Sequence, residues 1–238
     1  MRIGIFGGSF DPVHLGHLLL AEQALVQLSL ERVIFVPAAI PPHKQHLQLT
    51  GKQQRLEMLH LAIGGNDRFV VDTFELDREE VSYTVDTLLE FRQSMENDDL
   101  YLLMGADSLF EFATWKEPQR ICQLAIPVVV ARPGSPAPDL SVLRSYVDDR
   151  RYREIEEAAF ESLQVEISSS SIREAASGGQ RFRPLLYSLF KRGTSNHRWQ
   201  KLSPLHPSVG GGGERKVCHL FGCWWPQFIR QLSFIPQA

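Results

Sequence analysis

Two histidines, His14 and His17, lie three residues apart at the end of a turn that contains two consecutive glycines. The stretch reads "GGSFDPVHLGH" over residues 7–17, between a short apolar run and a segment with helical spacing of apolar residues. Residues three apart share one face of a helix, so both imidazoles can point the same way. The helix N-terminus adds N–H donors and a partial positive charge, and Gly16 lets a ligand approach the backbone. This pattern predicts a site for the oxygens of a polyphosphate.

The spacing of the glycines excludes two common phosphate-binding motifs. A dinucleotide fingerprint needs G-x-G-x-x-G, and a phosphate loop ends in Gly-Lys-Ser/Thr. The glycines here are Gly4, Gly7 and Gly8, and no such lysine follows them. A lone histidine is usually a cap or a core residue. The pair at this spacing, directly after a Gly-Gly turn, favours anion binding instead.

A second candidate cluster is "ISSSSIRE", residues 167–174. Its four serines lie where a strand pattern ends and a helix pattern starts, so their hydroxyl and N–H groups can line an anion site. Arg173 can hold phosphate oxygens with two parallel hydrogen bonds. The alternative is that the serines only cap a helix.

Strand and helix patterns alternate along the first 186 residues, and these elements would position the two clusters. Strand patterns cover 2–6, 32–37, 68–76, 99–105, 125–132 and 163–167. Helix patterns cover 15–28, 55–63, 82–95 and about 141–161, and capping boxes at Thr50 and Ser171 each predict a helix start. The alternation predicts an α/β fold with a doubly wound parallel sheet. Ligands of such sheets bind at the carboxyl ends of the strands, near the switch in strand order.

The two clusters together resemble a known family. Gly8-Ser9-Phe10-Asp11-Pro12, then His14-Leu15-Gly16-His17, and finally Ile167 to Arg173 are similar to the paired motifs of the nucleotidylyltransferase superfamily. Within it the chain most resembles the bacterial nicotinate mononucleotide adenylyltransferases. The supporting stretches are Pro41-Pro42-His43-Lys44, Ser82-Tyr83-Thr84, Asp86-Thr87-Leu88, Gly105-Ala106-Asp107-Ser108, Trp115 and Arg132-Pro133-Gly134. The resemblance covers residues 1–186 and implies the Rossmann-like fold of that superfamily.

The resemblance also implies which residues form the site. The implied catalytic residues are His14, His17, Lys44 and Arg173. Those implied to bind ATP and its phosphates are Gly8, Ser9, Phe10, Gly16, Ser170, Ser171 and Ile172. Gly105 and Asp107 are implied to bind the nucleotide and its ribose, and Thr84 and Trp115 to bind the nicotinate. Other interpretations stay open, since Asp107 and Thr84 could cap helices and Trp115 could be a core residue.

The implied reaction transfers the adenylyl group of ATP to nicotinate mononucleotide, giving nicotinate adenine dinucleotide and pyrophosphate. A phosphate monoester is already an anionic nucleophile, so catalysis reduces to positioning and charge neutralisation. Mg²⁺ is expected to arrive with ATP, because the sequence shows no dedicated carboxylate cage. We expect no metal site of the protein's own, a cytoplasmic location, and neither a membrane nor a nucleic acid as partner.

Two alternative functions are kept. One is another adenylyl- or cytidylyltransferase of the superfamily, such as pantetheine-phosphate adenylyltransferase. The Ser82-Tyr83-Thr84 and Trp115 segments argue against it. The other is a non-catalytic nucleotide-binding relative. Class I aminoacyl-tRNA synthetases share a similar histidine turn, but the K-M-S-K-S loop is missing from this sequence.

The resemblance departs from the family pattern in two places. Relatives commonly carry an aromatic residue after the tryptophan, where this chain has Lys116, and an inward-turned Lys116 would attract a carboxylate. Residues 187–238 form an atypical tail with seven Lys or Arg against one Asp or Glu, although the whole chain has net charge −3. The tail is either an extension or the product of a shifted reading frame, and we favour the second. Its four-glycine run and four prolines predict an irregular segment outside the catalytic domain.

Overall fold

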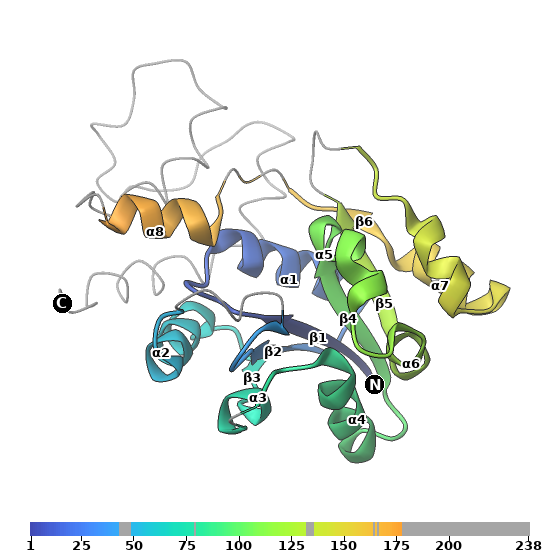
Figure 1. The fold of residues 1–238 in the computed structure, drawn as a ribbon, viewed down its shortest axis with the longest axis horizontal. Helices are drawn as coiled ribbons and strands as arrows, with labels where there is room; N and C mark the ends of the chain where they lie inside the picture. Colours follow the sequence, from blue (N-terminus) through green and yellow to red (C-terminus); the bar gives the residue numbers. More distant parts are fainter. Residues whose placement is uncertain (43–48, 79, 132–135, 164, 166, 178–238) are drawn as a thin grey trace, which may run out of the picture.

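The computed structural model describes residues 1–42, 49–78, 80–131, 136–163, 165 and 167–177. These residues form one six-stranded sheet with the strand order β3-β2-β1-β4-β5-β6 (Figure 1). Every neighbouring pair is parallel, as predicted. The strands are β1 (Arg2–Gly8), β2 (Arg32–Pro37), β3 (Phe69–Val71), β4 (Asp99–Gly105), β5 (Ile126–Ala131) and β6 (Phe160–Glu161).

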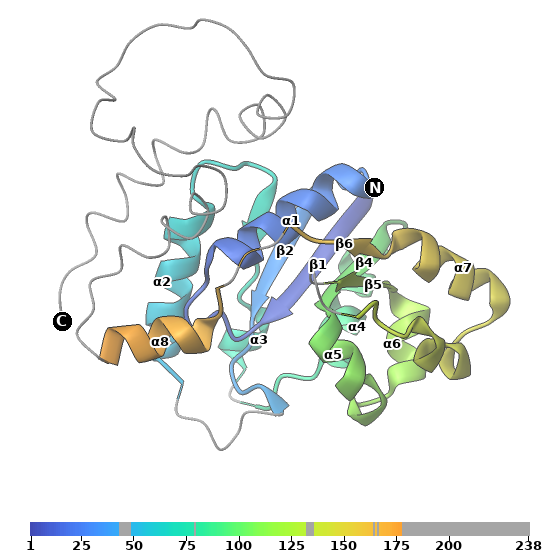
Figure 2. The ribbon, with the colours of Figure 1, turned by 90° about the horizontal axis from the view of Figure 1, so that it is seen from above.

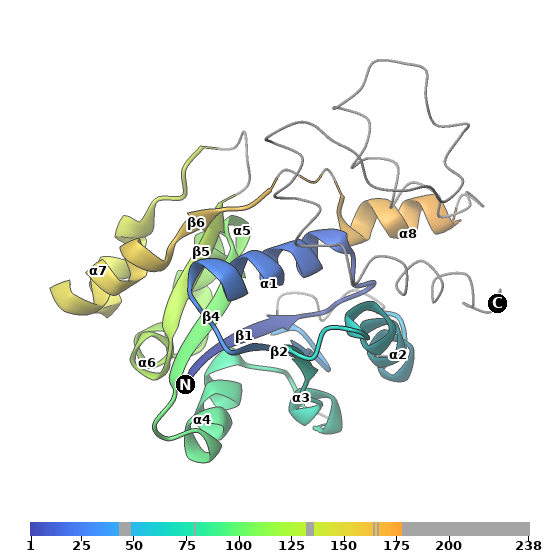
Figure 3. The same ribbon diagram turned by 180° about the vertical axis from the view of Figure 1, so that it is seen from behind.

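Helices cover both faces of the sheet (Figures 1 and 3). They are α1 (Leu15–Gln27), α2 (Lys52–Ile63), α3 (Phe74–Asp77), α4 (Thr84–Ser94), α5 (Ala106–Glu111), α6 (Pro118–Leu124), α7 (Asp149–Ala158) and α8 (Ser169–Ser177). Two 3₁₀ turns, η2 (Phe112–Thr114) and η3 (Leu140–Tyr146), join them. None of the helices in the described ranges is long and apolar enough to cross a membrane.

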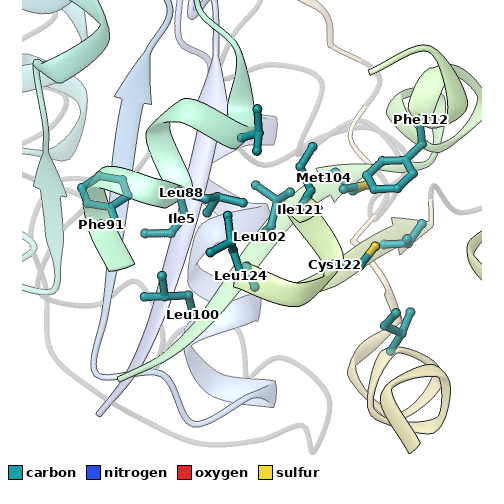
Figure 4. Packing of buried hydrophobic residues seen from close by; sticks show 14 of the residues in the cluster. Ile5, Leu88, Phe91, Leu100, Leu102, Met104, Phe112, Ile121, Cys122 and Leu124 are labelled. Atoms are coloured by element: carbon teal, nitrogen blue, oxygen red, sulfur yellow. The ribbon is translucent and has the colours of Figure 1, made fainter. Parts of the chain in front are cut away.

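Two hydrophobic clusters form the core, one on each face of the sheet. Because successive side chains of a strand point to opposite faces, Ile5 of β1 packs in one cluster and Phe6 in the other. The first cluster holds the apolar faces of α4 and α6 against β1 and β4 (Figure 4). The second holds α1 and α2 against β1 and β2. Strands buried on both faces account for the nearly continuous apolar runs in the sequence.

The strand order reverses between β1 and β4. From β1 the chain adds β2 and then β3 on one side, and it returns to add β4, β5 and β6 on the other. The carboxyl ends of β1 and β4 are Gly8 and Gly105. The histidine turn after β1, and Gly105 and Asp107 at the end of β4, therefore lie at this switch point, where open α/β sheets bind ligands.

The structure corrects two predicted strands. The third is only Phe69–Val71, since Asp72 Oδ1 accepts the N–H of Phe74 at 2.8 Å and the chain then turns into α3. The sixth is Phe160–Glu161 rather than 163–167. Of residues 163–167, the described ones lie in no strand.

The two predicted capping boxes are also corrected. The N-cap of α2 is Gly51, without a side-chain hydrogen bond, and the Thr50 N–H donates to Asp11 Oδ2 at 3.3 Å. The last helix begins at Ser169, two residues before the predicted start at Ser171. Ser168 precedes it, and its Oγ accepts the Ser171 N–H at 3.1 Å.

Candidate active site

A cavity of about 1010 Å³ opens at the carboxyl ends of β1 and β4. Most of the predicted site residues line it: Gly8, Ser9, His14, Gly16, His17, Thr84, Gly105, Asp107, Trp115, Ser170, Ser171 and Arg173. Phe10 and Ile172 are buried beside the cavity rather than in its lining. Lys44, like Arg132-Pro133-Gly134 and residues 187–238, lies outside the described residues. The chain thus brings together segments that are more than 150 residues apart in the sequence.

The two histidines form a stacked pair at the start of α1. His14 is the N-cap residue, and its backbone N–H donates to Nδ1 of His17 at 3.2 Å. The two rings are 3.7 Å apart between centroids and 26° from parallel. A backbone N–H can only donate, so Nδ1 of His17 must accept, and the proton of the neutral ring is on Nε2. This arrangement makes Nε2 of His17 a hydrogen-bond donor.

Phe10 supports the histidine pair by packing against the ring of His17. Its backbone has φ 44°, in the left-handed region that side chains other than glycine rarely adopt. Its ring is 1% exposed and meets the ring of His17 edge-on, with 5.1 Å between centroids. The rings of Phe6 and Phe35 pack on the ring of Phe10. This packing holds the turn in its strained conformation and fixes the plane of His17.

Gly16 leaves room where the start of α1 approaches Ile167, at the beginning of the serine segment. A Cβ atom on Gly16 would lie 3.1 Å from the ring of His14 and 3.6 Å from Cγ2 of Ile167. A side chain here would require the His14 ring to shift by a few tenths of an ångström. The glycine therefore allows the close approach of these groups, whereas the predicted approach of a ligand to its backbone stays a prediction.

The serine segment is attached to the turn after β1. The chain between β6 and α8 passes over α1 (Figures 2 and 3). Ser169 Oγ donates to the Pro12 carbonyl at 2.9 Å. Arg173 donates from Nη1 to the Asp11 carbonyl at 2.5 Å and from Nη2 to Ser170 Oγ at 3.2 Å. The guanidinium therefore joins α8 to the turn and lines the cavity at the same time.

Ser168 and Ser171 form a reciprocal pair at the start of α8. The Ser168 N–H donates to Ser171 Oγ at 3.1 Å, and the Ser171 N–H donates to Ser168 Oγ at 3.1 Å. This geometry is a capping box in which a serine occupies the third helical position. Ser171 thus takes part in the cap of α8 and also lines the cavity. Ser170 accepts a hydrogen bond from the guanidinium of Arg173.

A buried arginine that the sequence analysis missed holds the other side of the turn. Arg55 on α2 is 1% exposed and donates to the carbonyls of Ser9 at 2.7 Å and Thr50 at 3.0 Å. Asp11, also 1% exposed, lies close enough to interact with it electrostatically. Burial lowers the pKa of Arg55, and the charge of Asp11 acts in the opposite direction. The only sequence signal was an arginine in register with Leu59 on the apolar face of a helix.

Another wall of the cavity, which we call the α4 wall, is made of Glu75 on α3, Ser82 before α4, Thr84 and Thr87 on α4, and Trp115 after η2. The N-cap of α4 is Tyr83 and Thr84 is the first helical residue, so Thr84 is not the cap. Trp115 packs on Phe112 with 5.3 Å between ring centroids while it lines the cavity, so it is both a core contact and a cavity residue.

Lys116 turns away from the cavity. Its Nζ lies 2.9 Å from Oδ1 and 3.0 Å from Oδ2 of Asp86, and 4.9 Å from the centre of the Tyr83 ring. The hydrogen bond with Asp86 raises the pKa of Lys116. An inward Lys116 that attracts a carboxylate is therefore not what the structure shows.

The end of β4 gives a fourth wall. Gly105 is the N-cap of α5, and a Cβ atom there would meet nothing within 4 Å, so its backbone faces open space. Asp107 is in the first turn of α5 rather than at its cap, and it lines the cavity. The four walls together offer donors from the histidine pair and Arg173 on one side, and a carboxylate beside an open backbone on the other.

The chain is similar to known proteins over most of its described residues. The model of the cytidylyltransferase-like family matches residues 5–175. A probable nicotinate-nucleotide adenylyltransferase of Rhodopirellula baltica is 44% identical over 181 residues, which are 76% of this chain and 85% of that protein. A protein with the same name from Thermus thermophilus is 52% identical over 136 residues, 57% of this chain and 72% of its own length.

Solved structures share the fold. The nicotinic acid mononucleotide adenylyltransferase of Plasmodium falciparum, complexed with NaAD, superposes with a TM-score of 0.59 at 17% identity. The match covers 77% of this chain and 88% of that one. At this identity the likeness shows the six-stranded doubly wound architecture alone.

Proposed function

Because the chain belongs to the cytidylyltransferase-like family and, within it, to the nicotinate-nucleotide adenylyltransferases, we propose that its cavity joins ATP to nicotinate mononucleotide. The products are nicotinate adenine dinucleotide and pyrophosphate, a step of NAD biosynthesis. The observation that carries the proposal is that the histidine pair, Arg173 and the α4 wall line one cavity at the switch point of the sheet. We propose residues 1–186 as the catalytic domain and the cytoplasm as its location.

The proposed mechanism needs no covalent intermediate. The 5′-phosphate oxygen of the mononucleotide attacks the α-phosphorus of ATP, and the bond to the β-phosphate oxygen breaks. Nε2 of His17 donates to oxygens whose charge grows in the transition state, with His14 beside it. Arg173, Ser170 and Ser171 hold the β- and γ-phosphates as pyrophosphate forms. We assign Lys44 to the same phosphates on the family motif.

A divalent cation belongs to this scheme as part of the ATP substrate. Oxygens of the phosphates are the ligands that Mg²⁺ prefers, and several waters complete its shell. Within the described ranges, no three His, Cys, Asp or Glu side chains are grouped to hold a metal. We propose that Mg²⁺ enters and leaves with the phosphates, because their oxygens are its preferred ligands, and that the protein's own donors act on the other phosphate oxygens.

The acid mononucleotide should be preferred to the amide. The N-terminus of α4 and Thr84 offer hydrogen-bond donors, which suit two acceptor oxygens and leave a carboxamide NH₂ facing donors. A mispaired buried polar group costs about 1–3 kcal/mol, so we expect about 10–100-fold higher kcat/KM for nicotinate mononucleotide near neutral pH. Pyrophosphate release with ATP and each mononucleotide measures it.

The same assay separates the alternatives. Equal kcat/KM for the two mononucleotides would contradict the proposed pocket. Turnover with pantetheine phosphate instead would assign the chain to another adenylyltransferase. ATP binding without pyrophosphate release from any partner would identify a non-catalytic relative.

Replacing Arg173 by lysine should weaken ATP binding. An ammonium cannot donate to the Asp11 carbonyl and to Ser170 with the spacing of the guanidinium, nor hold two phosphate oxygens in parallel. Hydrogen bonds to charged groups contribute about 1.5–3 kcal/mol, so the KM for ATP should rise by about 10–100-fold. Arg150→Lys, on the exposed face of α7, is the matched control. An unchanged KM in Arg173→Lys would place Arg173 outside the phosphate site.

A further inference from the structure

The mechanism above does not use the buried carboxyl group of Glu75. Glu75 on α3 is 8% exposed, and it lines the cavity together with Ser82, Thr84 and Thr87 of the α4 wall. This is the wall to which the proposed function assigns the pyridine ring. A charged group in such a place costs free energy unless it is paired or has a use.

Two hydroxyl groups hold the carboxyl of Glu75. Thr87 Oγ1 donates to Oε1 of Glu75 at 2.6 Å, and the Ser82 hydroxyl also bonds to this carboxyl. Ser82 Oγ in turn accepts the N–H of Ala39 at 3.0 Å, which leaves its hydroxyl proton for Glu75. The carboxyl is therefore bonded to two groups that can act as donor or acceptor by rotating the hydroxyl.

No ion pair neutralises Glu75 within the described part of the chain. Burial raises its pKa, and the hydrogen bonds from Thr87 and Ser82 partly offset this effect. Of the charged neighbours on its own segment, Arg78 lowers the pKa and Asp72 raises it.

The other elements around Glu75 add little charge. On α2, Lys52 Nζ donates to the Leu76 carbonyl at 3.2 Å. On α4, the carboxylate of Asp86 is paired with Lys116. The segment that follows β2, residues 38–42, contains no titratable side chain. An anionic substrate bound at this wall would add a negative charge near Glu75.

We propose that Glu75 is a specificity-determining residue that couples the binding of an anionic pyridine substrate to the uptake of one proton. The inference rests on the proposed function. Nicotinate mononucleotide would bring a second carboxylate to a wall that already holds one, and two like charges in a poorly solvated site favour a proton on one of them. The proton comes from solvent and binds to a carboxyl oxygen of Glu75, while the hydroxyl of Ser82 or Thr87 rotates to accept from it. Nicotinamide mononucleotide adds no such charge and takes up no proton.

The pH dependence of substrate choice tests this in the unmodified protein. The ratio of kcat/KM for the acid to kcat/KM for the amide should be constant at low pH. Above the pKa of Glu75 in the free protein it should fall by up to about tenfold per pH unit, because one proton is taken up. Both mononucleotides carry the same 5′-phosphate, whose titration cancels in the ratio. Calorimetry of nicotinate mononucleotide binding in two buffers of different ionisation enthalpy should show proton uptake, and nicotinamide mononucleotide should show none.

Two variants and a control sharpen the result. Glu75→Gln keeps the shape without the charge, and its ratio should not depend on pH. Thr87→Val removes a donor that stabilises the charged form, so the fall of the ratio should begin at higher pH. Glu90→Gln, exposed on α4, should behave as the unmodified protein. A ratio that stays flat in the unmodified protein, with turnover of the acid, overturns the inference alone. Absence of turnover with nicotinate mononucleotide at every pH overturns the proposed function instead.

Discussion

His17→Ala should lower kcat by about 10²–10³-fold, the usual cost of losing one preorganised donor to the transition state. The ring is held for this purpose by the N–H of His14 on Nδ1, by its stack on His14 and by the edge of Phe10. Because Nε2 donates to charge that develops during the reaction, the KM for ATP should change much less than kcat. Single-turnover measurements with saturating ATP isolate the chemical step.

The matched control is His60→Ala, an exposed histidine on α2 outside the cavity, which should leave kcat unchanged. The removed ring also supports the His14 N–H, so the melting temperature of His17→Ala must be measured alongside. If His17→Ala lowers the melting temperature so far that the protein is partly unfolded under assay conditions, the loss of kcat reports on the fold of the turn. His17 would then not be shown to act on the phosphates.

Arg55→Met should destabilise the protein by about 2–6 kcal/mol, because each of two carbonyl groups that lose their donor costs about 1–3 kcal/mol. Methionine fills part of the volume but leaves the carbonyls of Ser9 and Thr50 without their donor and the carboxylate of Asp11 without its neighbouring charge. Urea denaturation followed by circular dichroism gives the free energy of unfolding.

Arg120→Met on the exposed face of α6 is the comparison, since the partner of its guanidinium among the described residues is Gln123, one turn away. A surface change of that kind should stay within about 0.5 kcal/mol. If Arg55→Met loses no more stability than Arg120→Met, the buried guanidinium does not hold the turn together.

The architecture was predictable because the spacing of apolar residues is regular within most of the strands and helices. Parallel strands buried on both faces produce apolar runs, and the helices between them carry apolar residues at helical spacing. In a doubly wound sheet the residues that follow the central strands meet at its carboxyl edge, so His14 and Asp107 were expected to lie together, and both line the cavity. Ser170 also lines the cavity, although the strand over 163–167 that was predicted to place it there does not form.

The last strand was predicted in the wrong place for a physical reason. Leu163, Val165 and Ile167 alternate with polar residues, which is the pattern of a half-buried strand. In the structure these three side chains line the cavity, and Leu163 is 50% exposed. The alternation of apolar and polar residues predicts an extended chain with one apolar side. It does not determine whether that side packs in the core of the protein or lines a cavity.

Glu75 and Arg55 escaped prediction because their environment comes from distant segments. Glu75 was placed within a strand pattern, and its partners Ser82 and Thr87 come from another element. Arg55 lies on α2, and the Ser9 carbonyl that it bonds precedes it by 46 residues. No local period reports such contacts. Lys116 could be recognised as unusual, but its pairing with Asp86 depended on how α4 packs.

The placement of β1 between β2 and β4 has a consequence for the protein during its synthesis. When residues 2–37 have left the ribosome, β1 can pair on one edge only, because β4 begins at Asp99. Arg173 and Ser169, which bond to the turn after β1, are made last among these groups. The ribosome adds 136 residues between residue 37 and residue 173, so at about 5–20 residues per second the nascent chain waits for roughly 7–27 seconds with its turn unsupported. Until β4 has been made, one edge of the central strand is open to other chains, so a chaperone that covers strand edges should bind the nascent chain and release the finished one.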